Sequence, residues 1–208
     1  MILKYLYDSI LFDFDGVLLD SEPVHFQCWK QILEPLGVRL DWETYIEKCI
    51  GVSDYEMLVF LGSRADPPVP AERLWQEYPR KNALFVERIS RRPPVPAETR
   101  KLLEELHLQL PLAVVSSSSQ REVVTILETA GLRPFFRTVV CSEDVSRHKP
   151  DPEPYRIAAA RLGVERPLVV EDSESGEKSG RAAGFDVVRV ASAEETAARV
   201  RERISNFR

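Results

Sequence analysis

Two aspartates lie two positions apart in the segment Leu11-Phe12-Asp13-Phe14-Asp15-Gly16-Val17, inside a largely apolar run. Residues i and i+2 of a β-strand point to the same side, so these two carboxylates could share one electrophile or one metal ion. Gly16 would let the chain turn sharply after them. An Asp-Gly turn explains Asp15 and Gly16. It does not explain Asp13, because an apolar side chain would be easier to bury there. The segment therefore favours a chemical role for the pair.

Three later segments place polar side chains where apolar runs end. Ser116 ends the second run, Lys149 follows the third, and Glu171 and Asp172 end the fourth. Taken singly, the serine could cap a helix, the lysine could be a surface cation, and the two acids could cap a turn. Ligands of parallel α/β sheets bind at the carboxyl ends of strands. Together with the aspartate pair, these segments predict one crevice that contains acids, a hydroxyl and a lysine.

The elements that must position these groups can be read from hydrophobic patterns. Five short apolar runs predict buried strands: Ser9–Asp13, Leu112–Ser116, Thr138–Ser142, Leu168–Asp172 and Asp186–Val190. Helical spacing and closing glycines predict helices between the last four: Gln120–Ala130, a helix from the Asp151-Pro152 cap to Gly163, and Gly176–Ala183. Alternating strands and helices predict an α/β fold, a Rossmann-like parallel sheet sandwiched by helices.

The segment between the first two strands breaks this alternation. It shows helical patterns and no convincing strand, with helices expected from Ser21 to Gly37 and over Trp42–Ile50, Ser53–Leu61 and Ala71–Ile89. Pro93-Pro94 marks the exit from this segment. We therefore predict a core domain of residues 1–20 and 94–208, interrupted by a helical cap domain of residues 21–93.

Composition and charge limit the classes of partner. The chain has 208 residues, a formal net charge of −5 and a pI near 5.4, which argues against nucleic acid or an anionic membrane as the main partner. Its three cysteines form no CxxC pair, so we expect no zinc site and reduced, buried thiols in the cytoplasm. No signal peptide and no membrane-spanning run are recognisable. We expect a cytoplasmic monomer, although no pattern reports the oligomeric state.

The order of the four polar segments closely resembles the motifs of the haloacid dehalogenase superfamily. The matching residues are Asp13-Phe14-Asp15-Gly16-Val17, the strand-end Ser116, Lys149-Pro150, and Glu171-Asp172-Ser173 followed by Gly176. The resemblance covers Ile10 to Val190, and the ordered set of four is highly specific. The helical insertion resembles the type with a small α-helical cap, and the group most similar is the β-phosphoglucomutase-like phosphatases.

The resemblance implies a phosphatase that acts on a small phosphorylated metabolite, such as a sugar phosphate. Asp13 matches the family nucleophile and would form an aspartyl-phosphate. Asp15 would protonate the leaving alcohol and then accept a proton from the attacking water. Ser116 would hydrogen-bond a transferring oxygen, and Lys149 would neutralise charge on the phosphoryl group and the nucleophile.

The resemblance also implies a Mg²⁺ cofactor, because a carboxylate that attacks an anionic phosphate needs a cation. Asp13 and Asp172 would be direct ligands, together with the backbone carbonyl of Asp15. Glu171 would join them or lie just outside the ligand shell.

Substrate-binding residues are expected on the cap and after the second strand. His25, Gly51 and Lys81 would face the substrate from the cap, and Ser117 and Ser118 from the core. All except Gly51 have a structural alternative: His25 could be a packed helix residue, Lys81 an exposed helical lysine, and the two serines a polar turn.

A phosphosugar mutase of the β-phosphoglucomutase type is the alternative function. In the mutases an arginine follows the Gly-Val-Ser segment of the cap, where this chain has Asp54 after Gly51-Val52-Ser53. A carboxylate there would repel a second phosphate, which favours the phosphatase, whereas His25 and Lys81 favour the mutase.

A binding protein without catalytic activity is a third hypothesis. Such a protein would be expected to lack one of Asp13, Asp15, Lys149 or Asp172, and all of them are present. This favours an enzyme.

Overall fold

The computed structural model describes residues 6–50 and 52–205, and it separates into two compact units. One unit comprises Ser21–Arg91 and is called the helical unit below. The residues on both sides of it form the other, called the α/β unit. Whether these units correspond to functional core and cap domains remains a prediction.

The α/β unit is built on a parallel sheet of five strands in the order β3-β2-β1-β4-β5. The strands are β1 Ser9–Phe12, β2 Leu112–Val115, β3 Thr138–Val140, β4 Pro167–Glu171 and β5 Asp186–Arg189. Every residue of β1, β2 and β4 is buried, which accounts for their continuous apolar sequences. The predicted fold class is therefore confirmed.

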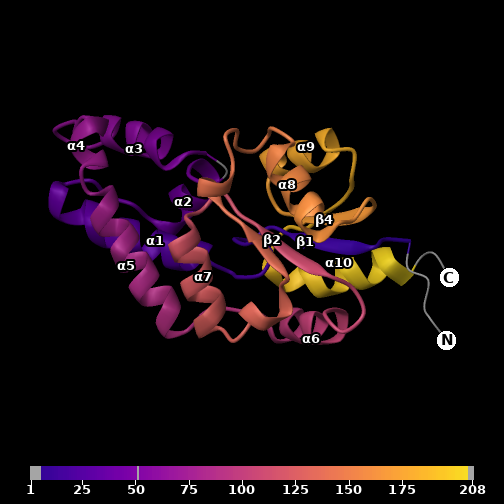
Figure 1. The fold of residues 1–208 in the computed structure, drawn as a ribbon. Helices are drawn as coiled ribbons and strands as arrows, with labels where there is room; N and C mark the ends of the chain where they lie inside the picture. Colours follow the sequence, from indigo (N-terminus) through magenta and orange to yellow (C-terminus); the bar gives the residue numbers. More distant parts are fainter. Residues whose placement is uncertain (1–5, 51, 206–208) are drawn as a thin grey trace. The chain divides into compact units, whose positions relative to one another are not determined.

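Helices cover both faces of this sheet. The helical segments of the unit are α6 Ala97–Leu106, α7 Gln120–Thr129, η2 Arg133–Phe135, η3 Ser142–Asp144, α8 Glu153–Leu162, α9 Glu174–Ala182 and α10 Ala193–Ser205. Figure 1 shows α8 and α9 on one side of the strands and α6 and α10 on the other. Tyr155 and Ala158 of α8 pack on Leu11, Ala113 and Val169 of the three central strands.

The strand register brings the ends of three strands to one edge. Phe12 pairs with Val114 of β2 and Val170 of β4, and the Asp13 backbone N–H donates to the Val170 carbonyl at 2.9 Å. Side chains that follow β1, β2 and β4 therefore emerge side by side.

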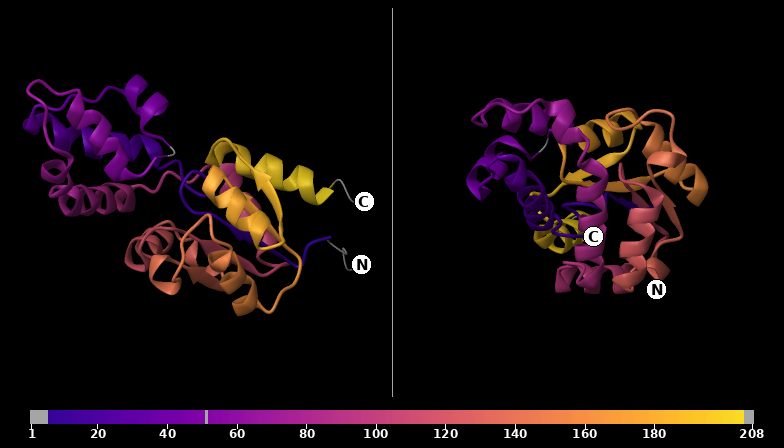
Figure 2. Two further views of the ribbon diagram at one scale, coloured as in Figure 1. Left: turned by 90° about the horizontal axis from the view of Figure 1, so that it is seen from above. Right: turned by 90° about the vertical axis from the view of Figure 1, so that its left-hand side faces the viewer.

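The helical unit contains helices and no strand among residues 21–50 and 52–91 (Figure 2). They are α1 Glu22–Leu33, η1 Glu34–Leu36, α2 Trp42–Lys48, α3 Asp54–Ser63, α4 Ala71–Trp75 and α5 Tyr78–Arg91. The unit has its own apolar core, which includes the fully buried Trp29, Leu33 and Leu58. None of the helices within residues 6–50 and 52–205 is both long and apolar enough to cross a membrane.

Several predicted helix boundaries were wrong, among them the start of the helix expected over Gly176–Ala183, which begins at Glu174. The expected helix Ala71–Ile89 is two helices, α4 and α5, because Pro79 lacks an N–H and can enter a helix only in its first turn. The helix expected to be capped by Asp151 begins at Glu153, but the Asp151 carboxylate still accepts from the Glu153 N–H at 2.9 Å.

Candidate active site

Lys149 joins two acidic side chains at the carboxyl edge of the sheet. Its Nζ donates to Asp13 Oδ1 at 2.6 Å, to Glu171 Oε1 at 2.6 Å and to the Val115 carbonyl at 2.9 Å. The lysine side chain is only 7% exposed. An ammonium group has three N–H donors, so all three are used. The side chain is thus held in one position between the ends of β1, β2 and β4.

The Glu171 carboxylate is saturated with donors. Its Oε1 accepts from Lys149 and from the Tyr155 hydroxyl at 2.8 Å. Its Oε2 accepts from the backbone N–H groups of Asp172 and Ser173, both at 3.1 Å, and from Ser173 Oγ at 3.0 Å. These donors account for the full lone-pair capacity of a carboxylate, which explains how Glu171 can be completely buried.

Two glycines allow the backbone to approach the acids closely. Gly16 has φ +69°, and a Cβ on it would lie 2.0 Å from Asp172 Oδ2. A Cβ on Gly176, in the first turn of α9, would lie 1.7 Å from Glu171 Oε1. Both positions therefore exclude any larger residue unless a carboxylate moves.

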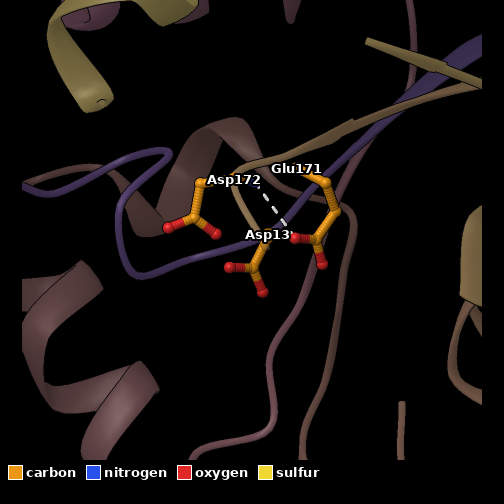
Figure 3. Close-up of side chains that lie close together, drawn as sticks. All are labelled: Asp13, Glu171 and Asp172. Carbon is orange, nitrogen blue, oxygen red and sulfur yellow. Dashed lines mark hydrogen bonds between the residues drawn. The ribbon is translucent and has the colours of Figure 1, made fainter. Parts of the chain in front are cut away.

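Three carboxylates gather at this edge. Figure 3 shows those of Asp13, Glu171 and Asp172 close together, and one ligand oxygen of each lies within 4.8 Å of the other two. Asp13 is 9% exposed, so little water reaches it. Clustered carboxylate oxygens are the donor set that Mg²⁺ prefers.

The pKa values reflect one cation shared among several acids. Burial, and then the charge of Glu171, raise the pKa of Asp13 well above its ordinary range. Burial, and then the charges of Glu171 and Asp15, raise the pKa of Asp172 to about 7. At Glu171, burial acts to raise the pKa, but Lys149 and the hydrogen bonds from Ser173 and Tyr155 together lower it. At Lys149, burial acts to lower the pKa, but the Asp13 and Glu171 carboxylates together raise it. The excess negative charge would be relieved by a divalent cation, so these residues fit a Mg²⁺ site.

The second aspartate and the serines lie beside this cluster. Ser118 Oγ donates to Asp15 Oδ2 at 3.4 Å, and the Ser118 N–H donates to Ser116 Oγ at 3.0 Å. Ser117 is exposed. Because β1 ends at Phe12, the aspartate pair lies in the following loop, and the strand alternation proposed to align the two carboxylates does not apply.

The residues proposed for the cap contact one another within the helical unit. Lys81 is 2% exposed, with its Nζ 2.9 Å from His25 Nδ1 and 3.7 Å from Asp54 Oδ2. The His25 ring stacks on Phe85 with centroids 3.8 Å apart. Burial, and then the charge of Lys81, hold the pKa of His25 well below its usual range. The alternative reading of Lys81 as an exposed helical lysine was wrong, and Gly51 lies outside the described residues.

One contact at the site was missed by sequence reasoning. Tyr155 lies inside the helix predicted from Asp151 to Gly163 and carried no predicted role at the site, yet its hydroxyl donates to Glu171. The available signal was a tyrosine, rather than a phenylalanine, at a buried helix position, because a buried hydroxyl needs a partner.

Comparisons with known proteins agree with the motifs. The family model described as haloacid dehalogenase-like hydrolase matches residues 10–190. A phosphorylated carbohydrates phosphatase of Thermotoga maritima is 30% identical over 183 residues, which cover 86% of this chain and 82% of that protein. A β-phosphoglucomutase of Bacillus subtilis is 26% identical over 189 residues, which cover 88% of this chain and 82% of that protein. The structure of CbbY from Rhodobacter sphaeroides in complex with phosphate has a TM-score of 0.68 and 26% identity, covering 89% of this chain and 87% of that one.

Proposed function

Because the chain belongs to the haloacid dehalogenase-like hydrolases, we propose that it is a Mg²⁺-dependent phosphatase that works through an aspartyl-phosphate. The observation that carries the proposal is the contact of Lys149 with both Asp13 and Glu171, each at 2.6 Å. A catalytically silent protein would have no need to hold a buried lysine against two buried acids, since such pairs add little net stability.

The proposed reaction has two displacement steps. An Asp13 carboxylate oxygen attacks phosphorus, the bond from phosphorus to the substrate oxygen breaks, and Asp15 gives its proton to that oxygen. Asp15 then accepts a proton from water while the water oxygen attacks phosphorus. The bond between Asp13 and phosphorus breaks, inorganic phosphate leaves, and both carboxyl groups return to their starting states. Lys149 stays hydrogen-bonded beside Asp13 and stabilises the charge on the transferring group.

The carboxylates of Asp13 and Asp172 would hold the metal ion, with the backbone carbonyl of Asp15, and the fully hydrogen-bonded Glu171 carboxylate would lie just outside these ligands. Bound Mg²⁺ would neutralise negative charge on the phosphoryl oxygens and so reduce their repulsion of the nucleophile. Ser116, which is 6% exposed, would hydrogen-bond one of these oxygens.

We propose a small phosphorylated metabolite, a sugar phosphate above all, as the substrate, with Ser118 and Ser117 near it. The name of the Thermotoga relative supports this class. We further propose a cytoplasmic monomer, and the three free, buried cysteines are consistent with a reducing compartment.

The mutase is the second candidate, supported by the relative from Bacillus subtilis. A mutase must also hold a non-reacting phosphate, which requires an uncompensated cation. Lys81 is instead paired with Asp54 inside the helical unit, and this pairing favours the phosphatase.

A panel of phosphate esters, assayed for inorganic phosphate with and without Mg²⁺, tests the proposal. Asp13→Asn should abolish release. Asp8→Asn is the matched control, because Asp8 accepts from the Glu165 and Arg166 N–H groups before β1 begins. Glucose 1-phosphate with a bisphosphate activator separates the candidates, since a phosphatase yields inorganic phosphate and a mutase yields glucose 6-phosphate. No turnover on any ester would refute both.

A further inference from the structure

Tyr155 of α8 connects the core of the α/β unit to the acidic cluster. Its ring packs with Leu11, Ala113 and Val169, and the residue is fully buried. Its hydroxyl donates to Glu171 Oε1 at 2.8 Å, and Lys149 Nζ lies 5.1 Å from its ring centroid. We propose that Tyr155 is a positioning residue, whose hydroxyl fixes the Glu171 carboxylate and thereby the Lys149 ammonium. The catalytic consequence rests on the proposed function.

The orientation of Glu171 depends on donors at both oxygens. Ser173 and two backbone N–H groups fix Oε2. Only two side-chain donors reach Oε1 among the described residues, namely Tyr155 and Lys149. Of these, Lys149 must remain beside Asp13 for the reaction. Without the Tyr155 hydroxyl, one acceptor site of a buried carboxylate is left empty, which is unfavourable.

The position of Lys149 follows from that of Glu171. Each of its three N–H donors has one partner, on Asp13, on Glu171 and on the Val115 carbonyl. If the Glu171 carboxylate turns to find a new donor, Lys149 loses one of its three acceptors. The ammonium then gains freedom to leave the side of Asp13, where the phosphoryl group must be stabilised.

The substitution Tyr155→Phe isolates this effect, because the ring that packs on the strands and faces Lys149 is retained. Tyr7→Phe is the matched control. Tyr7 is 4% exposed in the same unit, and its hydroxyl donates to Asp186 at 2.7 Å. Tyr7 precedes β1, however, whereas the acidic cluster lies after the carboxyl end of that strand. Each variant loses one tyrosine hydroxyl, but the Asp186 side chain is 52% exposed whereas Glu171 is fully buried, so we expect Y155F to lower the melting temperature more than Y7F does.

The kinetic expectation separates positioning from structural support. In Y155F, kcat should fall about 10- to 100-fold with KM changed less than about twofold, as for other outer-shell partners of active-site ligands. Y7F should leave kcat and KM within about twofold of the wild-type values, because the Tyr7 hydroxyl donates to Asp186 and not to a residue of the acidic cluster. In a Glu171→Ala background, Y155F should cost less than about twofold, because the acceptor through which the Tyr155 hydroxyl acts is then absent. If the loss of kcat in the double variant equals the product of the losses in the two single variants, the proposal is overturned.

An NMR measurement tests the positioning without turnover. The ammonium protons of a buried, fully bonded lysine exchange slowly with water, so wild type should show a ¹H–¹⁵N ammonium signal that is absent in Lys149→Met. This signal should be lost or broadened in Y155F and retained in Y7F. A signal that persists unchanged in Y155F would overturn the inference. A wild type inactive on all esters would instead overturn the proposed function.

Discussion

Replacing Lys149 with methionine removes the cation that Asp13 and Glu171 share while keeping a long side chain of similar volume. Two carboxylates, one of them fully buried, would lose a donor at 2.6 Å. The loss should affect both the chemical step and the stability of the protein, and the two effects can be measured separately.

The expected magnitudes follow from burial. Removing a charge-stabilising donor from a water-excluded site typically lowers kcat about 10²- to 10³-fold, which is about 2.7–4 kcal/mol of transition-state stabilisation. Breaking a buried ion pair on one side costs about 3–5 kcal/mol of stability near neutral pH, because it leaves uncompensated charge. The Lys149 side chain is 7% exposed, so solvent screening reduces this figure little.

The stability loss should depend on pH. Lys149 now holds the pKa of Glu171 below its ordinary value against the effect of burial. Without it, burial should raise that pKa above the unfolded value, so the folded variant binds a proton more tightly than the unfolded chain. The difference in the free energy of unfolding between wild type and K149M should therefore be small near pH 5 and grow towards pH 8.

Urea unfolding at several pH values and phosphate-release kinetics measure these effects. Lys178→Met is the matched control, since Lys178 is 64% exposed and forms an i,i+4 pair with Glu174 on α9. Exposed pairs of this kind contribute about 0.3–0.5 kcal/mol, so the control should change neither stability nor turnover appreciably. Near-normal turnover of K149M would refute the role of Lys149 in the chemical step. A loss of unfolding free energy that does not change with pH would refute the effect of Lys149 on the pKa of Glu171.

Two further predictions concern the proposed metal ligands. In Gly16→Ala the new Cβ would lie 2.0 Å from Asp172 Oδ2, so we expect Mg²⁺ affinity, measured by calorimetry, to fall at least about tenfold. Gly37→Ala has the same kind of strain at φ +77° with no atom within 4 Å, and should leave the affinity unchanged. Because folding raises the pKa of Asp172 from 3.8 to about 7, the free energy of unfolding without Mg²⁺ should fall as pH rises through this range. The Tm increase on adding Mg²⁺ should consequently be larger at pH 8 than at pH 5, and an equal increase at both would contradict the assignment.

The sheet and the polar groups at its edge were predictable because each carries its own local signal. Strands buried on both faces require continuous apolar runs, and a charge that ends such a run has to be explained. The helices α6 and α10 were not predicted, although buried positions such as Leu102, Leu103 and Leu106 follow helical spacing. Neither segment is followed by a glycine, which is the boundary signal that marks the other predicted helices of this unit.

Contacts that depend on tertiary packing could not be predicted. The Tyr155 hydroxyl reaches Glu171 only because α8 crosses the strands at one position. Similarly, the pairing of Lys81 with Asp54 joins α5 to the start of α3, and no local pattern relates the two. The substrate-binding roles proposed for His25, Gly51 and Lys81 stay predictions.

Charge at the sheet edge explains why metal dependence should be strict. Lys149 is the one cation hydrogen-bonded to the carboxylates of Asp13 and Glu171 within the described residues, and Asp172 adds a third acid beside them. A phosphate monoester dianion that approaches this cluster would be repelled unless a second, mobile cation is bound. In the proposed mechanism the fixed lysine would orient the nucleophile, whereas an exchangeable Mg²⁺ could arrive or leave with the phosphate. Phosphate binding and Mg²⁺ binding should therefore strengthen each other, as reciprocal coupling requires.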